Sequence, residues 1–296
     1  MSRAARAREN RAGIVAMIAA VGLLALMDGG LKQLAAHYPP LQVTALRACA
    51  SLPIVVAWIA WRGAFAGLLR VRWPLHLLRG VLGVAMLSLF AYALKRLPLA
   101  DAYSIFFVAP LLITALSVPI LGEHVEWRRW VAIGVGMGGV LIVLKPTGEG
   151  VLTLAGVATL LAAVAYAVSA ITVRMLARTD STQSMMFWLT AMMAIGAGAL
   201  AAPNWQALRF GDWPVIAGVA VTGALGQYAI TEAFRRGEAS VIAPFEYTAL
   251  AWGLALDWFV WSVAPAWRML AGAAVIIAAG VYLVHRERVH VEAERP

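Results

Sequence analysis

The chain has 296 residues, of which 62% are hydrophobic and only 13% are charged, and its mean hydropathy is +0.80. Soluble domains carry roughly 25% charged residues, so this composition excludes a water-soluble globular protein and predicts one surrounded mostly by lipid. The net charge of +9 comes from short basic clusters between apolar runs, which is typical of membrane-protein loops and argues against a nucleic-acid partner.

The amino-terminal segment combines basic residues with an apolar run, as a secretory signal peptide does. Four arginines precede Gly13, and the apolar run continues to about Ala36. The apolar region of a signal peptide has only about 7–15 residues, so we expect residues 13–36 to form a retained spanning helix.

Ten apolar segments are long enough to cross a bilayer as helices, for which about 20 residues are needed at about 1.5 Å per residue. Turn or charge signals separate them, and no connection is long enough to hold a soluble domain. The predicted spans are 13–36, 41–61, 74–94, 99–121, 127–144, 152–173, 183–202, 213–233, 239–260 and 266–284.

The second half of the chain repeats features of the first half at an offset of 140 residues. The matches are Leu94-Lys95-Arg96 with Phe234-Arg235-Arg236, Gly83 with Gly223, and Trp127-Arg128 with Trp267-Arg268. Three matches at one offset predict a duplication. Each half then holds five spans, an odd number, so the second half is inverted in the membrane. We therefore predict an all-α integral membrane fold of ten transmembrane helices in two inverted five-helix repeats, at residues 13–146 and 147–284.

The distribution of Lys and Arg near the span ends predicts the orientation of the chain. With the amino terminus in the cytoplasm, seventeen of the 24 Lys and Arg residues, Arg79 among them, lie on the cytoplasmic side. Five lie on the opposite side, and Lys32 and Arg47 lie within spans. We therefore expect two cytoplasmic tails, residues 1–12 and 285–296.

Several motifs resemble the EamA-type branch of the drug/metabolite transporter superfamily. They are Leu89–Leu94, Ala109-Pro110, Leu121-Gly122-Glu123, Trp127, Ala229–Phe234, Ala243-Pro244-Phe245-Glu246-Tyr247 and Trp267–Leu283, with Arg47 at a basic position common in that branch. The second half departs from the pattern at Trp261-Ser262-Val263, where a Gly followed by an acid would match Gly122-Glu123. The resemblance implies a ten-helix transporter of the bacterial inner membrane, similar to metabolite and aromatic amino-acid exporters, with both termini in the cytoplasm.

Three ionisable residues lie inside the first two predicted spans, where each costs at least ~2.5–3.5 kcal/mol and so needs a reason to be there. Asp28 and Lys32 are four residues apart on one helix face. Asp28 is either a substrate-facing or ion-coupling carboxylate, or half of a structural ion pair in which Lys32 reaches the interface. Arg47 either binds a substrate carboxylate or tethers helix ends.

Glu246 lies two residues after Pro244 in the predicted ninth span. A proline inside a helix frees a backbone carbonyl and can kink or unwind the helix, and transporters build their sites at such breaks. Glu246 with Tyr247 is therefore the main candidate for the substrate site, with a structural role as the alternative. Glu246 and Asp28 are also the candidates for ion coupling. Pro110 is expected to break the fourth span in a comparable place.

Polar and aromatic side chains within other spans are further candidates for the cavity. Polar stripes inside spans face other helices or a cavity rather than lipid, so these residues either line the cavity or join helices. The candidates are Ser88, Tyr92, Tyr166, Ser169, Gln227 and Tyr228, together with Trp188, whose indole is expected to stack on an organic substrate.

No motif indicates an enzyme, a metal site or a cofactor. The five histidines have no metal-ligand spacing, and the chain has no GxxxxGK[ST] motif for ATP. Gly134–Gly139 contains a GxxxG, which lets helices approach closely, so the protein is expected to be a monomer or a homodimer.

These features predict a secondary transporter that moves small organic metabolites by alternating access between its two halves. Amino acids are the expected cargo and export the expected direction, with the cargo and membrane lipid as the expected partners. A transporter of drugs, organic cations or nucleotide-linked metabolites is the alternative. An integral-membrane enzyme and a passive membrane scaffold are the alternatives outside transport.

Overall fold

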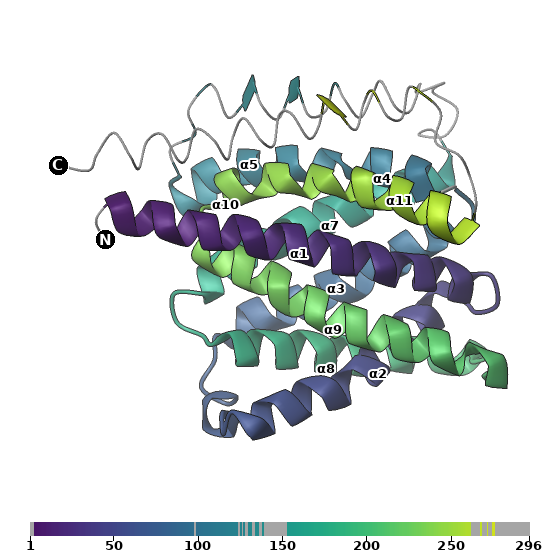
Figure 1. Cartoon of the computed structure of the whole chain (residues 1–296). Helices are drawn as coiled ribbons and strands as arrows, with labels where there is room; N and C mark the ends of the chain where they lie inside the picture. The colour runs from purple at the N-terminus through teal and green to yellow at the C-terminus, as the bar shows by residue number, and fades with distance from the viewer. Residues whose placement is uncertain are drawn as a thin grey trace.

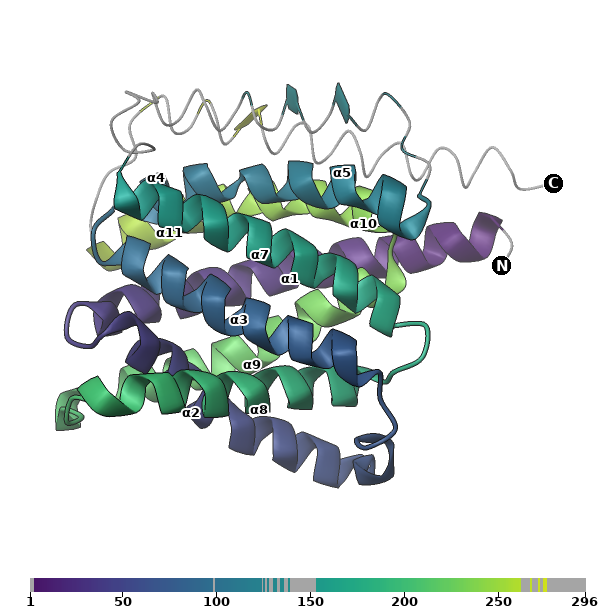
Figure 2. The ribbon, with the colours of Figure 1, turned by 180° about the vertical axis from the view of Figure 1, so that it is seen from behind.

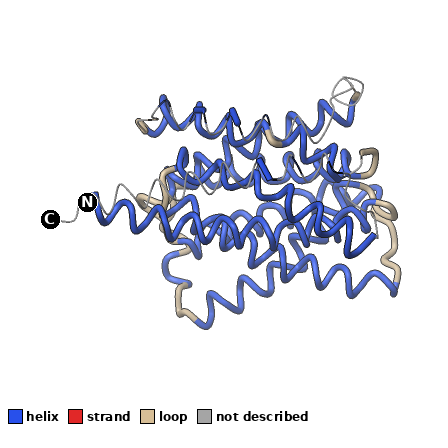
Figure 3. Tube along the Cα trace, turned by 45° about the horizontal axis from the view of Figure 1, so that its top comes forward, coloured by secondary structure: helices blue, strands red, loops and turns tan. Residues whose placement is uncertain are grey.

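Helices make up almost all of the protein, and no strand occurs among the described residues (Figure 3). The computed structural model describes residues 3–97, 99–123 and 153–261, with single positions between 125 and 138 and between 267 and 275. Its helices are α1 (Arg3–Ala35), α2 (Pro40–Trp61), α3 (Trp73–Leu94), α4 (Leu99–Phe106), α5 (Val108–Leu121), α7 (Leu154–Leu176), α8 (Thr182–Ala201), α9 (Trp213–Arg236), α10 (Ala239–Ile242) and α11 (Ala249–Trp261).

Within the described part of the chain, six helices are long and apolar enough to cross a membrane, namely α1, α2, α3, α7, α8 and α9. They coincide with six of the predicted spans, and the chain is a multi-pass membrane protein. The predicted spans 127–144 and 266–284 and the predicted tail 285–296 lie outside the described residues, apart from single positions.

The predicted spans 99–121 and 239–260 are both interrupted, as Pro110 and Pro244 led us to expect. The first is divided into α4 and α5 at Phe107. The second consists of α10, a 3-10 helix η4 (Ala243–Thr248) and α11. Proline has no N–H to donate to the carbonyl four residues earlier, and its ring clashes with that carbonyl. Each interruption therefore falls within the turn that precedes the proline.

The first helix begins earlier than we predicted. α1 starts at Arg3, so most of the predicted tail 1–12 continues the helix instead of leading into it. The sequence Ala-Ala-Arg-Ala-Arg-Glu after Arg3 contains only strong helix formers, and nothing in it caps or ends a helix.

Helices of the first half pack against helices of the second half (Figures 1 and 2). α1 lies along α9, α3 lies along α7, and α2 lies on α8. At the offset of 140 residues α1 corresponds to α7 and α3 to α9, so the first two contacts are counterparts. The helix starts agree with this offset, because Trp73-Pro74 opens α3 and Trp213-Pro214 opens α9.

Glycine allows the close approach of α1 and α9. A Cβ atom added to Gly226 would lie 2.9 Å from Cδ2 of Leu24, whereas one added to Gly218 on the same helix would meet nothing within 4 Å. We expect Gly226→Leu to lower the midpoint of thermal unfolding in detergent, because overpacking costs roughly 1–3 kcal/mol. Gly218→Leu is the control and is expected to leave the midpoint unchanged. Equal shifts in both variants would contradict this account of the helix contact.

Candidate substrate site

A cavity of about 150 Å³ lies where the two halves meet, lined from α1, α2, α3, α4, α7, α8, α9, η4 and α11. Most of its lining is apolar or aromatic, with Phe90, Tyr103, Phe106, Phe107 and Tyr166 along one side. Successive rings in this set lie 5.3–6.2 Å apart between centroids. The lining therefore offers an organic molecule a large apolar contact.

Four charged side chains also line the cavity, and all four are buried: Asp28, Arg47, Arg79 and Glu246. Two carboxylates and two guanidinium groups thus face one small volume. Charges are expensive inside a membrane protein unless they have partners, so the contacts of each indicate what the cavity is built to hold.

Each carboxylate accepts a hydrogen bond from a tyrosine on another helix. Tyr103 on α4 donates to Oδ2 of Asp28 on α1 at 2.8 Å. Tyr166 on α7 donates to Oε1 of Glu246 in η4 at 2.9 Å. Since α1 corresponds to α7, and α4–α5 to the segment containing η4, the two halves carry the same couple with acid and tyrosine exchanged. The interrupted span of each half is thereby tied to the first helix of that half.

Arg47 reaches the cavity from α2. Its Nε lies 3.0 Å from the sulfur of Met27 and its Nη1 lies 3.9 Å from the sulfur of Met193. A thioether is a weak acceptor, so these contacts position the guanidinium group without satisfying it. Asp28 is close enough to interact with Arg47 electrostatically.

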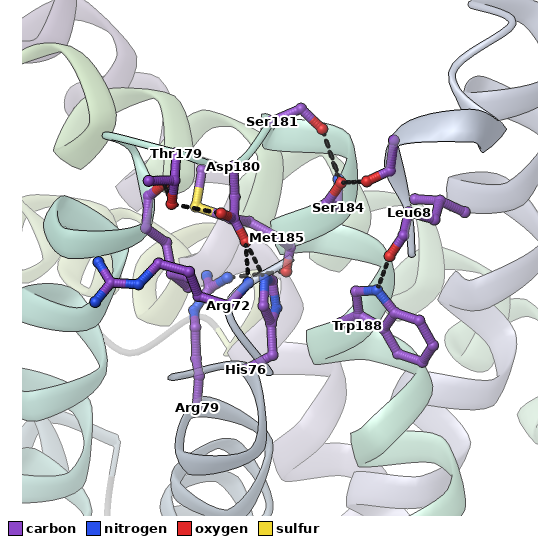
Figure 4. Close-up of polar contacts among 12 residues, drawn as sticks. Leu68, Arg72, His76, Arg79, Thr179, Asp180, Ser181, Ser184, Met185 and Trp188 are labelled. Atoms are coloured by element: carbon purple, nitrogen blue, oxygen red, sulfur yellow. Dashed lines mark hydrogen bonds and ion pairs between the residues drawn. The ribbon is translucent and has the colours of Figure 1, made fainter. Parts of the chain in front are cut away.

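Arg79 on α3 is a cavity residue that sequence reasoning missed (Figure 4). The orientation argument counted it among the cytoplasmic basic residues, but its side chain is buried. Its Nη1 donates to the carbonyl oxygen of Met185 at 2.9 Å, and its Nη2 donates to Oγ1 of Thr231 at 3.4 Å. The available signal was its place several residues inside a predicted span, which is the reason that Arg47 was singled out.

The structure brings six of the predicted site residues into the cavity lining: Asp28, Arg47, Tyr166, Ser169, Gln227 and Glu246. Ser88 and Tyr92 are not among them and line a separate apolar groove with residues of α8. Ser88 shares a hydrogen bond with Thr44 at 3.1 Å, and the guanidinium of Arg96 lies over the ring of Tyr92. Both residues therefore have contacts that join neighbouring side chains.

The structure places three predicted aromatic residues outside the cavity lining. Trp188 donates from its indole N–H to the carbonyl oxygen of Leu68 at 2.7 Å, so it fixes the connection between α2 and α3. Tyr228 is exposed and packs edge-on against Trp58. Tyr247 is buried behind Phe107, with ring centroids 5.4 Å apart. The expected stacking of Trp188 on the substrate therefore lacks support from its position.

One end of the bundle is closed by a group of residues that we call the His76 cluster: His76, Thr179, Asp180 and the backbone N–H of Arg72 (Figure 4). Nε2 of His76 lies 2.8 Å from Oδ2 of Asp180, which also accepts from the N–H of Arg72 at 3.1 Å. Thr179 donates to Oδ1 at 2.5 Å. The cluster joins α3 of the first half to the connection between α7 and α8 in the second.

The opposite end is closed by the Tyr38 cluster, which consists of Tyr38, Asp212 and the backbone N–H of Arg209. Tyr38 donates to Oδ2 of Asp212 at 2.7 Å and accepts from the N–H of Arg209 at 2.9 Å. Beside it, the amide of Gln42 bonds to both the N–H and the carbonyl of Gln206, at 2.9 and 2.7 Å. The connection after α1 thus meets the start of α9, as the connection after α7 meets the start of α3. Figure 1 shows these two connections at opposite ends of the bundle.

The hydrogen bonds of Asp180 decide the pH range in which the His76 cluster persists. Burial opposes ionisation of Asp180, but the bonds from Thr179, His76 and the N–H of Arg72 outweigh it and lower the pKa of the carboxyl. A lowered pKa stabilises the folded state above the ordinary value of about 3.9, and this contribution is lost as the pH falls through the lowered pKa. Asp180 therefore stays ionised throughout the physiological range.

The profile of the EamA-like transporter family matches the chain twice, at residues 11–145 and 153–286. The pseudopaline exporter CntI of Pseudomonas aeruginosa is 25% identical over 276 residues, which is 92% of this chain and 96% of the relative. The riboflavin transporter of Vibrio cholerae is 28% identical over 260 residues, 87% of each chain. The S-adenosylmethionine uptake transporter of Rickettsia bellii is 28% identical over 213 residues, 72% of this chain and 73% of the relative.

A solved crystal structure superposes with a TM-score of 0.78 at 21% identity, covering 96% of this chain and 99% of that one. At this identity the likeness shows the fold alone.

Proposed function

This chain belongs to the EamA-like transporter family, and we propose that it is a secondary transporter that exports amino acids by alternating access. The family and the named relatives are transporters rather than enzymes, and their cargoes are small metabolites. Relatives are named for export and for uptake alike, so the direction is part of the proposal. A carrier of drugs, organic cations or nucleotide-linked metabolites is the second candidate.

The observation that carries the proposal is the cavity between the halves, which holds two carboxylates and two guanidinium groups within an aromatic wall. An amino acid carries one positive and one negative group on an organic side chain, and the cavity offers an opposite charge for each. The volume of about 150 Å³ holds roughly ten waters at about 10–15 Å³ each, enough for a small solute.

The proposed mechanism uses two inverted five-helix repeats, at residues 13–146 and 147–284, that rock about the cavity. The reciprocal contacts of α1 with α9 and α7 with α3, and the exchanged acid–tyrosine couples, support this symmetry. The His76 and Tyr38 clusters would then be the two closures, one at each end, that must open in turn. Coupling requires that the cargo bind the two states with different affinities.

We further propose that the protein lies in the bacterial inner membrane with both termini in the cytoplasm. Without the buried Arg79, sixteen Lys and Arg residues remain on the proposed cytoplasmic side against five on the other. In this orientation the His76 cluster faces the cytoplasm and the Tyr38 cluster faces the opposite side.

The test of the function is uptake of a panel of radiolabelled amino acids by liposomes that contain the purified protein. Saturable uptake that related amino acids compete for is the expected result. If folded protein moved no amino acid, the amino-acid assignment would be wrong. The panel would then extend to organic cations and nucleotide-linked metabolites.

Proton coupling through Asp28 or Glu246 is a separate prediction. Each carboxylate faces the cavity and accepts a hydrogen bond from a tyrosine, so each can exchange a proton with the cavity. We expect Asp28→Asn or Glu246→Gln to abolish the dependence of the transport rate on an imposed pH gradient. Coupling through these groups would be abandoned if each variant kept both the rate and its pH dependence.

A further inference from the structure

We infer that Arg79 is the anchor for an anionic group of the cargo, most simply a carboxylate, and therefore a determinant of specificity. This inference rests on the proposed transport function and specifies the chemistry that the cargo must carry. It begins from the contacts of Arg79, which differ from those of the other charged cavity residues.

Arg79 is a buried charge with only neutral partners among the described residues. Its side chain is 2% exposed, and its acceptors are the carbonyl of Met185 and the hydroxyl of Thr231. Its Nε is fully buried and has no hydrogen-bond partner. Asp180, drawn near it in Figure 4, is engaged elsewhere, because both of its carboxylate oxygens accept bonds within the His76 cluster.

The other three charges of the cavity are better compensated. Asp28 and Arg47 interact electrostatically with each other, and both carboxylates accept a hydrogen bond from a tyrosine. A buried guanidinium group without a counter-charge is unfavourable, and an anion in the cavity would remove that penalty. Of the four, Arg79 is thus the group whose charge is left for a ligand to neutralise.

The geometry of Arg79 suits an anion with two oxygens. The bonds to Met185 and Thr231 come from α8 and α9, so the second half holds a guanidinium group that belongs to the first. They leave the Nε edge of the fork free. A carboxylate can accept two parallel hydrogen bonds from this edge, whereas a carboxamide presents one acceptor and one donor and cannot.

The experiment compares the inhibition of labelled amino-acid uptake by three competitors: the unlabelled amino acid, its carboxamide and its decarboxylated amine. Wild-type protein is expected to prefer the acid by at least about tenfold, as for a buried charge-assisted pair. Arg79→Gln is expected to bring the three competitors to within about threefold of one another, and Arg79→Lys to restore part of the preference. Thr231→Val removes one support of Arg79 and is expected to keep the preference.

A purely structural role for Arg79 predicts a different result, in which Arg79→Gln lowers uptake or stability but keeps the wild-type preference for the acid. That result would overturn the inference while leaving amino-acid transport intact. If wild-type protein moves no amino acid, the comparison is repeated on whichever labelled solute it does move. An anionic solute whose transport depends on Arg79 supports the anchor, and a solute without an anionic group that is transported contradicts it.

Discussion

Glu246→Ala is expected to abolish saturable uptake, with a loss of about 30-fold or more in the ratio of maximal rate to half-saturation concentration. Glu246 is buried in the interrupted ninth span and faces the cavity. Removing one partner of a buried hydrogen-bonded charge costs roughly 2–5 kcal/mol. Initial rates of labelled amino-acid uptake over a range of concentrations would measure the loss.

The tyrosine partner of Glu246 offers a matched control. Tyr166→Phe removes the hydroxyl that donates to Glu246, whereas Tyr228→Phe removes a hydroxyl on an exposed face of α9. We expect Tyr166→Phe to lower uptake severalfold and Tyr228→Phe to leave it unchanged. Normal saturable uptake by Glu246→Ala would show that the carboxylate has no part in binding or transport.

Asp180→Asn and Asp212→Asn are expected to open opposite ends of the protein. Each carboxylate is the acceptor that holds its cluster together, and each asparagine keeps the shape but removes the charge. Hydrogen bonds to charged groups contribute about 1.5–3 kcal/mol, so each change should shift the populations of the two states by about tenfold or more.

The populations can be followed by labelling a cysteine in the cavity. Cys49→Ser removes the only cysteine, and Ser169→Cys places one in the cavity lining. With an impermeant maleimide, Asp180→Asn should speed labelling from the side of the His76 cluster, and Asp212→Asn from the side of the Tyr38 cluster. Faster labelling from one and the same side in both variants would rule out the clusters as alternate closures.

Local chemistry made the interrupted spans predictable. Pro110 and Pro244 remove a hydrogen bond and clash with the preceding turn wherever they stand in a helix, so no tertiary information was needed. Asp28, Arg47 and Glu246 were predictable because a charge in an apolar span stands out. Arg79 has the same signal but was grouped with the loops because it lies close to a span end.

Side-chain direction was not predictable to one residue. Successive residues of a helix point about 100° apart, so an error of one position moves a residue from the cavity to another face. Tyr228 adjoins Gln227, and Trp188 adjoins Leu189, yet only Gln227 and Leu189 line the cavity. The position of Trp188 is set by its bond to Leu68, a residue 120 positions away.

Contacts between distant elements lay beyond the sequence for a related reason. Neither Tyr103 nor Tyr166 is near its carboxylate in the chain, with 75 and 80 residues between partners. The repeat could have been placed more firmly, since Trp73-Pro74 and Trp213-Pro214 match at the offset of 140 residues. That match identifies the helix starts where the second half of each cluster is found.

The most direct test of alternating access is counterflow in liposomes that contain the purified protein. Vesicles loaded with unlabelled amino acid are placed in a trace of the same labelled amino acid, and accumulation is followed over time. A carrier with one cavity that opens to each side in turn predicts a transient, saturable accumulation of label that Glu246→Ala abolishes. Equilibration of the label without any overshoot, at a rate independent of the internal amino acid, would contradict the account.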